Sequence, residues 1–208
     1  KPAEITPLTS LMLAEDCTRA GLPDGVVNVL TGAGRVAGEA LLAHPGVRMV
    51  SFTGSTAAGR RIGSILGERI GRMTLELGGK SAAVILDDAD LAAAVRGTVN
   101  ACFLNSGQTC TAHTRMLVPE SRYAEAAKLA AEAAAKFTVG DPFAETSKLG
   151  PVISAAQRDR VQDFIRKGIA EGAELLCGGP DAPAGLSRGY YVQPTVFGRV
   201  RPGSSIAQ

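Results

Sequence analysis

The sequence predicts an α/β fold with a parallel sheet, and three observations lead to this prediction. Short β-branched and aliphatic runs alternate with longer helical patterns along 208 residues, which is typical of βαβ units. Glycine-rich turns follow two of the expected strands and open the helices after them. The composition is 45% hydrophobic and 20% charged, as in an ordinary globular protein that buries a substantial core.

The first part of the chain alternates helices and strands. Helical patterns cover residues 8–20, 34–45 and 55–68, and the second of these stops before a proline, which cannot continue a helix. Strands are expected over 25–32, 47–54 and 73–79. The run GVVNVLTG, at 25–32, is β-branched and ends at glycine, which is typical of a short buried strand.

The second part continues the alternation. Strands are expected over 82–88, 115–119 and 173–179, and helices over 89–105, 121–137 and 154–171. Asp88 or Asp90 can cap the first of these helices and Ser121 the second. The sequence SAAQ at 154–157 has the capping-box pattern. The best boundary between two parts lies near Gly78 and Gly79, so we expect them to span 1–78 and 79–208.

Charge and composition exclude several partners. The net charge is +2, Lys and Arg never run beyond pairs, and aromatic residues make up 4% of the chain. These values do not fit a nucleic-acid-binding surface. No run approaches eighteen apolar residues, so we expect no membrane span. The opening KPAEITP has no apolar core after its Lys, so we expect no signal peptide in it.

The cysteines and histidines point to a reduced, metal-free protein. The four cysteines form no Cys-x-x-Cys pair, so we expect free thiols in the cytoplasm. His44 and His113 are the two imidazoles, and no zinc site is expected from ligands so far apart in the sequence.

Two strand-to-helix turns have the residues of a phosphate-binding turn. In TGAGRVAG, Gly32, Gly34 and Gly38 would let the backbone approach a pyrophosphate at a helix N-terminus. Their spacing is one residue longer than the usual dinucleotide pattern, and glycines at a tight turn need no ligand. In FTGSTAAG, Gly54 ends a strand and Ser55 stands at a helix start. A helix cap and a phosphate contact are compatible roles for Ser55.

Two further positions carry reactive groups, and each also has a simpler explanation. Glu76 precedes two glycines, which leaves room for a flat group, although it can equally be a surface residue before a turn. Cys110 ends the sequence GQTC near a helix end, where a thiol can be activated, although free cysteines usually serve as packing residues. His113 suggests a Cys-His pair, but in an extended segment it would point to the opposite face.

The other three cysteines are expected to be structural. Cys102 belongs to an apolar helix stripe, and Cys17 and Cys177 are also expected to be packing residues.

Together these motifs resemble the aldehyde dehydrogenase superfamily. The resemblance runs through the whole chain in order: KPAE, GLPDGVVNVLTGAG, FTGSTAAG, ELGGKSAAVILDDADL, NSGQTC and GYYVQPTVF. The spacing from Glu76 to Cys110 also matches the family. The resemblance implies parts of two Rossmann-like open sheets, with residues 1–78 in the NAD-binding domain and 79–208 in the catalytic domain.

The resemblance implies cofactor contacts on the adenosine side. Lys1 and Glu4 match the residues that bind the ribose hydroxyls, and Gly34 and Arg35 match positions beside the adenine. A carboxylate at position 4 accepts hydrogen bonds from a free 2′-hydroxyl and repels a 2′-phosphate, so Glu4 favours NAD over NADP.

The resemblance also implies contacts nearer to the reacting end of the cofactor. The turn from Gly54 to Gly59 matches the segment around the pyrophosphate, and Ser55 is its expected direct contact. Leu77 matches a residue whose backbone approaches the nicotinamide.

The implied reaction is oxidation of a small-molecule aldehyde to a carboxylic acid. Cys110 matches the nucleophile, which forms a hemithioacetal and then a thioester, and Glu76 matches the base that activates water for hydrolysis.

The resemblance further implies that the chain is a fragment. Family members are more than twice as long, form homodimers or homotetramers, and carry an upstream Asn in the oxyanion hole and a downstream Glu that holds the nicotinamide ribose. Loss of the Asn donor alone would cost about a hundredfold in rate. We therefore expect these 208 residues by themselves to be poorly active or inactive.

Two other functions stay open at this point. One is a thiol hydrolase or acyltransferase that uses Cys110 with His113 and needs no cofactor. The other is a non-catalytic nucleotide-binding fragment. The residues that flank Cys110, Thr109 and Thr111, do not identify the aldehyde.

Overall fold

A computed structural model describes residues 1–208, the whole chain, as two compact units, Lys1–Gly78 and Gly79–Gln208. Each unit combines helices with small open sheets. None of the helices has the length and apolar character needed to cross a membrane.

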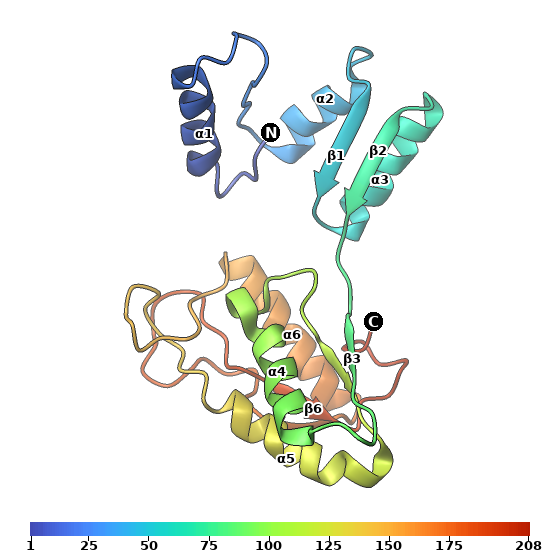
Figure 1. Cartoon of the computed structure of the whole chain (residues 1–208), viewed down its shortest axis with the longest axis vertical. Coiled ribbons are helices and arrows are strands. Elements are labelled where there is room, and N and C mark those ends of the chain that lie inside the picture. Colours follow the sequence, from blue (N-terminus) through green and yellow to red (C-terminus); the bar gives the residue numbers. More distant parts are fainter. The chain divides into compact units, whose positions relative to one another are not determined.

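The first unit is built around a two-stranded parallel sheet. Strand β1 (Met49–Thr53) pairs with β2 (Arg72–Glu76), and α3 (Thr56–Glu68) connects them and runs along them (Figure 1). Before β1 come α1 (Leu8–Arg19), a short π-helical turn η1 (Gly34–Gly38) and α2 (Glu39–Ala43). The β1–α3–β2 unit confirms the predicted helix between two parallel strands.

The core of the first unit lies between this sheet and two helices. Leu42 of α2 and Ile62 and Leu66 of α3 are buried and pack against apolar side chains of both strands. Alternate residues of β1 are half-buried and exposed, because successive side chains of a strand point to opposite faces. Helix α1 contributes no buried residue.

The predicted strand at 25–32 is wrong. The segment runs through bends and irregular backbone, with Gly25 and Gly32 at φ of 84° and 135°. Val26 and Val27 are 63% and 43% exposed. A β-branched run becomes a strand only where a neighbour pairs its backbone groups, and β1 and β2 pair with each other alone.

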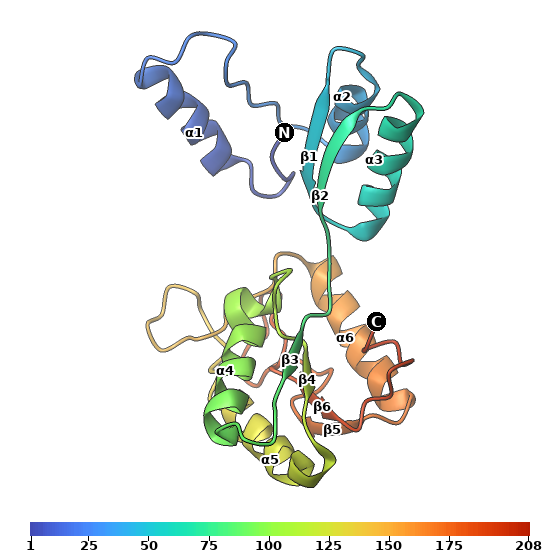
Figure 2. The ribbon, with the colours of Figure 1, turned by 45° about the vertical axis from the view of Figure 1, so that its right-hand side comes forward.

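The second unit begins with another parallel pair. Strand β3 (Ala82–Val84) pairs with β4 (Arg115–Leu117), and Figure 2 shows them side by side. Helix α4 (Leu91–Phe103) and the turn η2 (Leu104–Gly107) lie between them in the sequence. After β4 come the short helix η3 (Glu120–Arg122) and α5 (Tyr123–Ala134).

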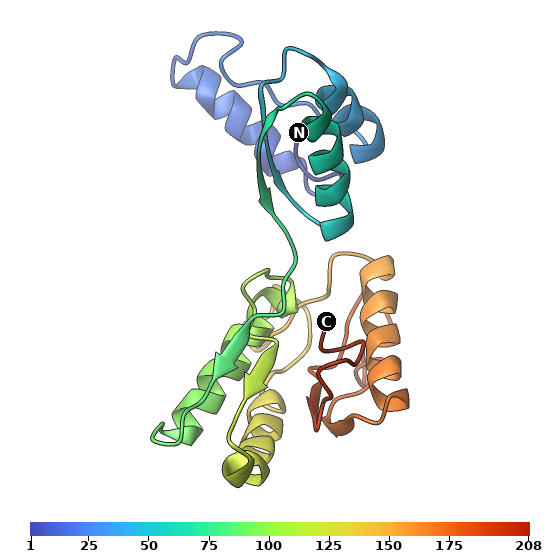
Figure 3. The same ribbon diagram turned by 90° about the vertical axis from the view of Figure 1, so that its right-hand side faces the viewer.

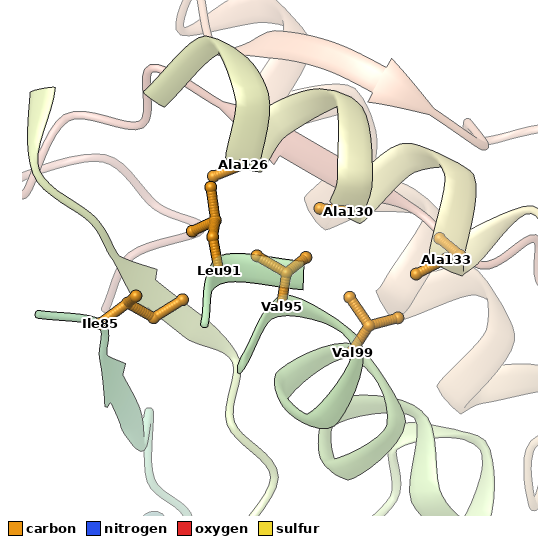
Figure 4. Packing of buried hydrophobic residues seen from close by; sticks show 8 residues of the cluster. Ile85, Leu91, Val95, Val99, Ala126, Ala130 and Ala133 are labelled. Atoms are coloured by element: carbon orange, nitrogen blue, oxygen red, sulfur yellow. The ribbon is translucent and has the colours of Figure 1, made fainter. Parts of the chain in front are cut away.

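The largest core of the molecule joins α4 and α5. Leu91, Val95 and Val99 of α4 face a row of buried alanines on α5, and Ile85 closes one end of the cluster (Figure 4). Alanine at these positions lets the two helices approach closely. Val95 is fully buried, so this contact holds α4, the helix that precedes the Cys110 segment.

The last part of the chain differs from the predicted all-parallel arrangement. Helix α6 (Ala155–Ala170) leads to β5 (Glu174–Cys177), which pairs antiparallel with β6 (Val196–Gly198), a strand that the sequence did not predict. Helix α6 runs beside the C-terminal segment (Figure 3). The Cα of Gly168 in α6 comes so close to this segment that a Cβ there would lie 2.9 Å from Ile206.

The helix starts show which of the predicted caps form. Asp90 caps α4 and accepts a hydrogen bond from the Ala93 N–H at 3.0 Å. Ser154 caps α6 and accepts from Gln157 N–H at 3.3 Å. The expectation for Ser121 is wrong, because η3 already includes it and α5 starts after Arg122 without a side-chain cap.

Candidate active site

The residues expected to bind the adenosine end of a cofactor meet at the first glycine turn. Lys1 Nζ donates to the Gly32 carbonyl at 2.9 Å, and the Glu4 carboxylate accepts from the Gly34 N–H. The partners of these two pairs are 31 and 30 positions apart in the sequence, so the fold brings these groups together. Arg35, the next residue of η1, is exposed. One oxygen of Glu4 stays free to accept a further hydrogen bond.

The second turn joins the ends of both strands of the first unit. Ser55 caps α3, and its Oγ accepts from the Ala58 N–H at 3.2 Å. The N–H of Gly54 donates to the Glu76 carbonyl at 3.0 Å, which places the expected pyrophosphate turn beside the end of β2. The Glu76 side chain is exposed and makes no hydrogen bond or ion pair within the chain.

Gly59 and Leu77 are in direct contact. A Cβ on Gly59 would lie 2.6 Å and 2.8 Å from the two methyl carbons of Leu77, which is closer than such atoms can approach. Glycine at this position therefore lets Leu77 pack onto α3. The contact fixes the segment directly after Glu76, whose backbone is expected to approach the nicotinamide.

In the second unit, Cys110 follows a sharp reversal at the end of α4. Asn105 and Ser106 have left-handed backbones with φ of 52° and 56°, and Gly107 follows at 75°. Such a conformation costs about 1–2 kcal/mol for a residue other than glycine, so other contacts must hold it. Asn tolerates it better than most residues because its side chain can hydrogen-bond locally.

Hydrogen bonds within the reversal and to a distant loop hold this conformation. Gln108 Nε2 donates to the Asn105 carbonyl at 3.2 Å, and its Oε1 accepts from the Ile153 N–H at 2.9 Å. Ser106 Oγ donates to the Gly150 carbonyl at 3.0 Å. The segment that carries Cys110 is thus attached to residues more than forty positions later in the sequence.

Cys110 itself has the properties of an available nucleophile. Its side chain is exposed and forms no disulfide. Its backbone N–H donates to no acceptor within the chain, so it can serve an oxyanion. The Cys110 carbonyl lies against Gly79, where a Cβ would be 3.6 Å away. No hydrogen bond joins Cys110 to the exposed His113, so the structure contains no Cys-His pair.

The other thiols of the second unit are of a different kind. Burial raises the pKa of the Cys102 thiol, and Lys80 opposes that shift in part. Burial also raises the pKa of Cys177, which packs against the main core. Cys102 lines a cavity of about 480 Å³ behind the reversal, together with Ser106 and Gly107. Cys110 does not line it.

No group of three His, Cys, Asp or Glu side chains is arranged to hold a metal ion.

The chain resembles known proteins over its whole length. The model of the aldehyde dehydrogenase family matches residues 1–208. The chain belongs to the aldehyde dehydrogenase family. It is 47% identical over 208 residues to a 3-succinoylsemialdehyde-pyridine dehydrogenase of a Pseudomonas species, and 45% identical over 209 aligned residues to a betaine aldehyde dehydrogenase of Brucella ovis. These alignments cover 100% of the chain and 44% and 43% of the relatives.

Solved aldehyde dehydrogenase structures have the same fold. A mutant of aldehyde dehydrogenase C from Pseudomonas syringae, in complex with NAD⁺ and octanal, superposes with a TM-score of 0.97 at 46% identity. It is matched over 100% of this chain and 43% of its own. A Mycobacterium tuberculosis aldehyde dehydrogenase with NAD⁺ superposes with a TM-score of 0.93 at 46% identity, over 98% of this chain and 42% of its own. The chain thus spans less than half the length of these relatives.

Sequence reasoning missed the side chains that anchor the Cys110 segment. Gln108 lies inside the motif GQTC, and Ser106 directly precedes the motif. No local sequence pattern identifies the hydrogen-bond partner of either residue. Their acceptor and donor groups lie in the backbone of Gly150 and Ile153, and only the tertiary fold brings these groups together.

Proposed function

We propose that this chain carries the nucleophile and the base for NAD-dependent oxidation of an aldehyde to a carboxylic acid. The observation that carries the proposal is the match of all 208 residues to the aldehyde dehydrogenase family. It is supported by an exposed, unpaired Cys110 thiol whose own N–H is unused.

In this mechanism the Cys110 thiolate adds to the aldehyde carbon and forms a hemithioacetal. The Cys110 N–H donates to the resulting oxyanion, because a preorganised donor stabilises charge that develops in the transition state. NAD, when bound, supplies the acceptor for the hydride that leaves this carbon. Cys110 then holds the acyl group as a thioester. Glu76 takes a proton from water, and the water oxygen displaces the thiolate to release the acid.

The residues of the first unit fit a dinucleotide. The Lys1 ammonium and the Glu4 carboxylate meet at the turn that contains Gly34, where they can bind ribose hydroxyls, with Arg35 on the adenine side. The free oxygen of Glu4 favours an unphosphorylated ribose, so we propose NAD rather than NADP. Gly54, Ser55 and Gly59 would hold the pyrophosphate at the start of α3, and Leu77 would approach the nicotinamide.

The substrate class is a small-molecule aldehyde. The relatives' names include a betaine aldehyde, phenylacetaldehyde and succinoylsemialdehyde-pyridine, and one solved relative holds octanal. The free cysteines support a reducing, cytoplasmic location, and the family resemblance supports a homodimeric or homotetrameric whole protein.

Octanal with NAD provides a direct test. Because turnover by these 208 residues is expected to be slow, the chain is used in stoichiometric amount, and both NADH absorbance and the mass of the Cys110 peptide are followed. We expect octanal-dependent NADH and an octanoyl group on Cys110. Cys110→Ser should abolish both.

The base has a separate readout. Glu76→Gln should leave the octanoyl adduct on Cys110 but slow its loss, because hydrolysis of the thioester needs the base. Glu68→Gln, at the exposed end of α3, is the matched control and should behave as wild type. Ester hydrolysis that needs His113 but neither NAD nor Glu76 would instead support a thiol hydrolase, and the absence of both NADH and adduct would contradict the proposal.

A further inference from the structure

We propose that Gln108 is a positioning residue for Cys110, with its side-chain amide holding the 104–110 reversal between Asn105 and Ile153. The inference rests on the proposed role of Cys110 as nucleophile. It adds a residue that acts through the loop and does not touch the substrate.

The amide of Gln108 uses both of its ends. Its Nε2 donates to the Asn105 carbonyl at 3.2 Å, and its backbone N–H donates to the same oxygen at 3.1 Å. Its Oε1 accepts from the Ile153 N–H at 2.9 Å. The Asn105 side chain returns a weaker bond to the Gln108 carbonyl at 3.4 Å. One side chain therefore closes the reversal and ties it to a second segment.

The second segment is a fixed anchor. Leu149 and Val152 are 5% and 7% exposed. The N–H of Leu149 donates to the Thr138 carbonyl at 3.0 Å, and the N–H of Val152 donates to the Tyr190 carbonyl at 2.9 Å. Because the reversal is hydrogen-bonded to this buried backbone, its position is fixed relative to it.

Ser106 makes an independent attachment to the same segment. Its Oγ donates to the Gly150 carbonyl at 3.0 Å in a half-buried environment. Ser106 is held with a left-handed backbone, a conformation that persists only when its surroundings impose it. Ser106 and Gln108 together attach the reversal on either side of Gly107.

The reversal positions Cys110, which comes two residues after Gln108. Its thiol and its N–H must both be in place when an oxyanion forms, and a displacement of about 1 Å can cost two orders of magnitude in rate. A small electrophile that forms no oxyanion needs only an accessible thiolate. The two kinds of reagent therefore separate positioning from exposure.

Two reagents make this distinction without a cofactor. With p-nitrophenyl acetate, the Cys110 sulfur bonds to the carbonyl carbon through an oxyanion, the ester C–O bond breaks, and p-nitrophenolate leaves with the electron pair. With iodoacetamide, the sulfur displaces iodide from a methylene carbon, and no oxyanion forms. The ratio of the two rate constants at Cys110 reports how well the N–H is placed.

The test compares Gln108→Met with wild type in the full chain. Methionine keeps the length of the side chain and loses both hydrogen bonds. We expect acylation of Cys110 to slow by about tenfold and alkylation to change by less than about threefold. Gln162→Met, on the half-buried side of α6 with no side-chain hydrogen bond, is the matched control and should leave the ratio unchanged.

Two further variants test the two attachments of the reversal, at Gln108 and at Ser106. Gln108→Glu keeps an acceptor for the Ile153 N–H but loses the donor to Asn105, so its ratio should lie between those of wild type and Gln108→Met. Ser106→Ala should lower the ratio in the same direction, whereas Ser121→Ala, an exposed serine without a side-chain bond, should not.

Equal changes in acylation and alkylation, or no change in either, would overturn the positioning role. A wild-type chain that is not acylated at Cys110 would overturn it as well. The two proposals fail in different ways. If acylation depends on Gln108 but octanal produces no NADH, the proposed oxidation is wrong and the positioning role of Gln108 stands. If octanal produces NADH and Gln108→Met does not slow it, the positioning role is wrong and the oxidation stands.

Discussion

At the residue scale, the thiols of the second unit differ in how exposed they are. Cys110 is exposed and lies on a loop anchored by Gln108. Cys102 and Cys177 are half-buried, and burial raises the pKa of both thiols. Because the thiolate is the reactive form, burial makes Cys102 and Cys177 less reactive, and the exposed Cys110 is the more accessible thiol.

This difference predicts the order of alkylation. At about pH 8, near the ordinary pKa of a thiol, iodoacetamide should modify Cys110 before Cys102 and Cys177. Peptide mass mapping over time measures the order. The modification of Cys102 and Cys177 should increase only at higher pH, because their folded-state pKa values are raised. Modification of Cys102 before Cys110 would contradict this picture.

The same shifts have a consequence for stability. A thiol whose pKa is raised by folding binds its proton more tightly in the folded state, so its contribution to stability is present below the ordinary thiol pKa. That contribution is lost as the pH rises above it. Alkaline conditions should therefore lower the free energy of unfolding of the second unit, because Cys102 and Cys177 lose their protons there.

At the element scale, α3 contains two glycines with opposite surroundings. Gly59 is buried against Leu77, whose methyl carbons leave no room for a Cβ. Gly63, one turn later, would place a Cβ 3.9 Å from the Met73 sulfur, which is an ordinary contact. The helix therefore needs glycine at the first position and not at the second.

Alanine substitutions at the two glycines should have opposite signs. Gly63→Ala should stabilise the chain by up to about 1 kcal/mol, because alanine is the better helix former. Gly59→Ala gains the same propensity but displaces Leu77, so we expect a net loss of about 1–2 kcal/mol and weaker NAD binding. Thermal unfolding and NAD titration measure the two effects. An equal gain from both variants would show that Leu77 moves at no cost.

At the scale of the whole molecule, the two units have cores of different size. The core of the first unit consists of three buried residues from α2 and α3. The core of the second unit consists of eight buried residues: Ile85, three residues of α4 and four of α5 (Figure 4). Since small domains bury too little surface to be stable by a wide margin, the second unit should be the more stable one.

Separate expression of the two units tests this inference. Residues 79–208 should unfold cooperatively in urea and keep the rapid alkylation of Cys110. Residues 1–78 should show a broader transition at lower urea, measured by circular dichroism. Addition of NAD should raise the midpoint of the first unit and leave that of the second unchanged. A cooperative first unit that outlasts the second would contradict the comparison of cores.

Local signals predicted much of the secondary structure. The caps Ser55, Asp90 and Ser154 form as expected, because a helix N-terminus is satisfied by the side chain directly beside it. The helices end close to their predicted limits, and the motifs from KPAE to GYYVQPTVF were sufficient to recognise the family that the comparison confirms. The roles of Cys110 and Glu76 follow from the same motifs and stay predictions.

Strand pairing and the long-range hydrogen bonds depended on partners that a local sequence pattern does not identify. The run at 25–32 is not a strand because no neighbour pairs with it, and β6 is a strand because β5 lies beside it. By itself, the sequence determined the helices, the family and the candidate nucleophile. Only the tertiary structure decided how Ser106 and Gln108 hold that nucleophile, because their partners are backbone groups more than forty residues away.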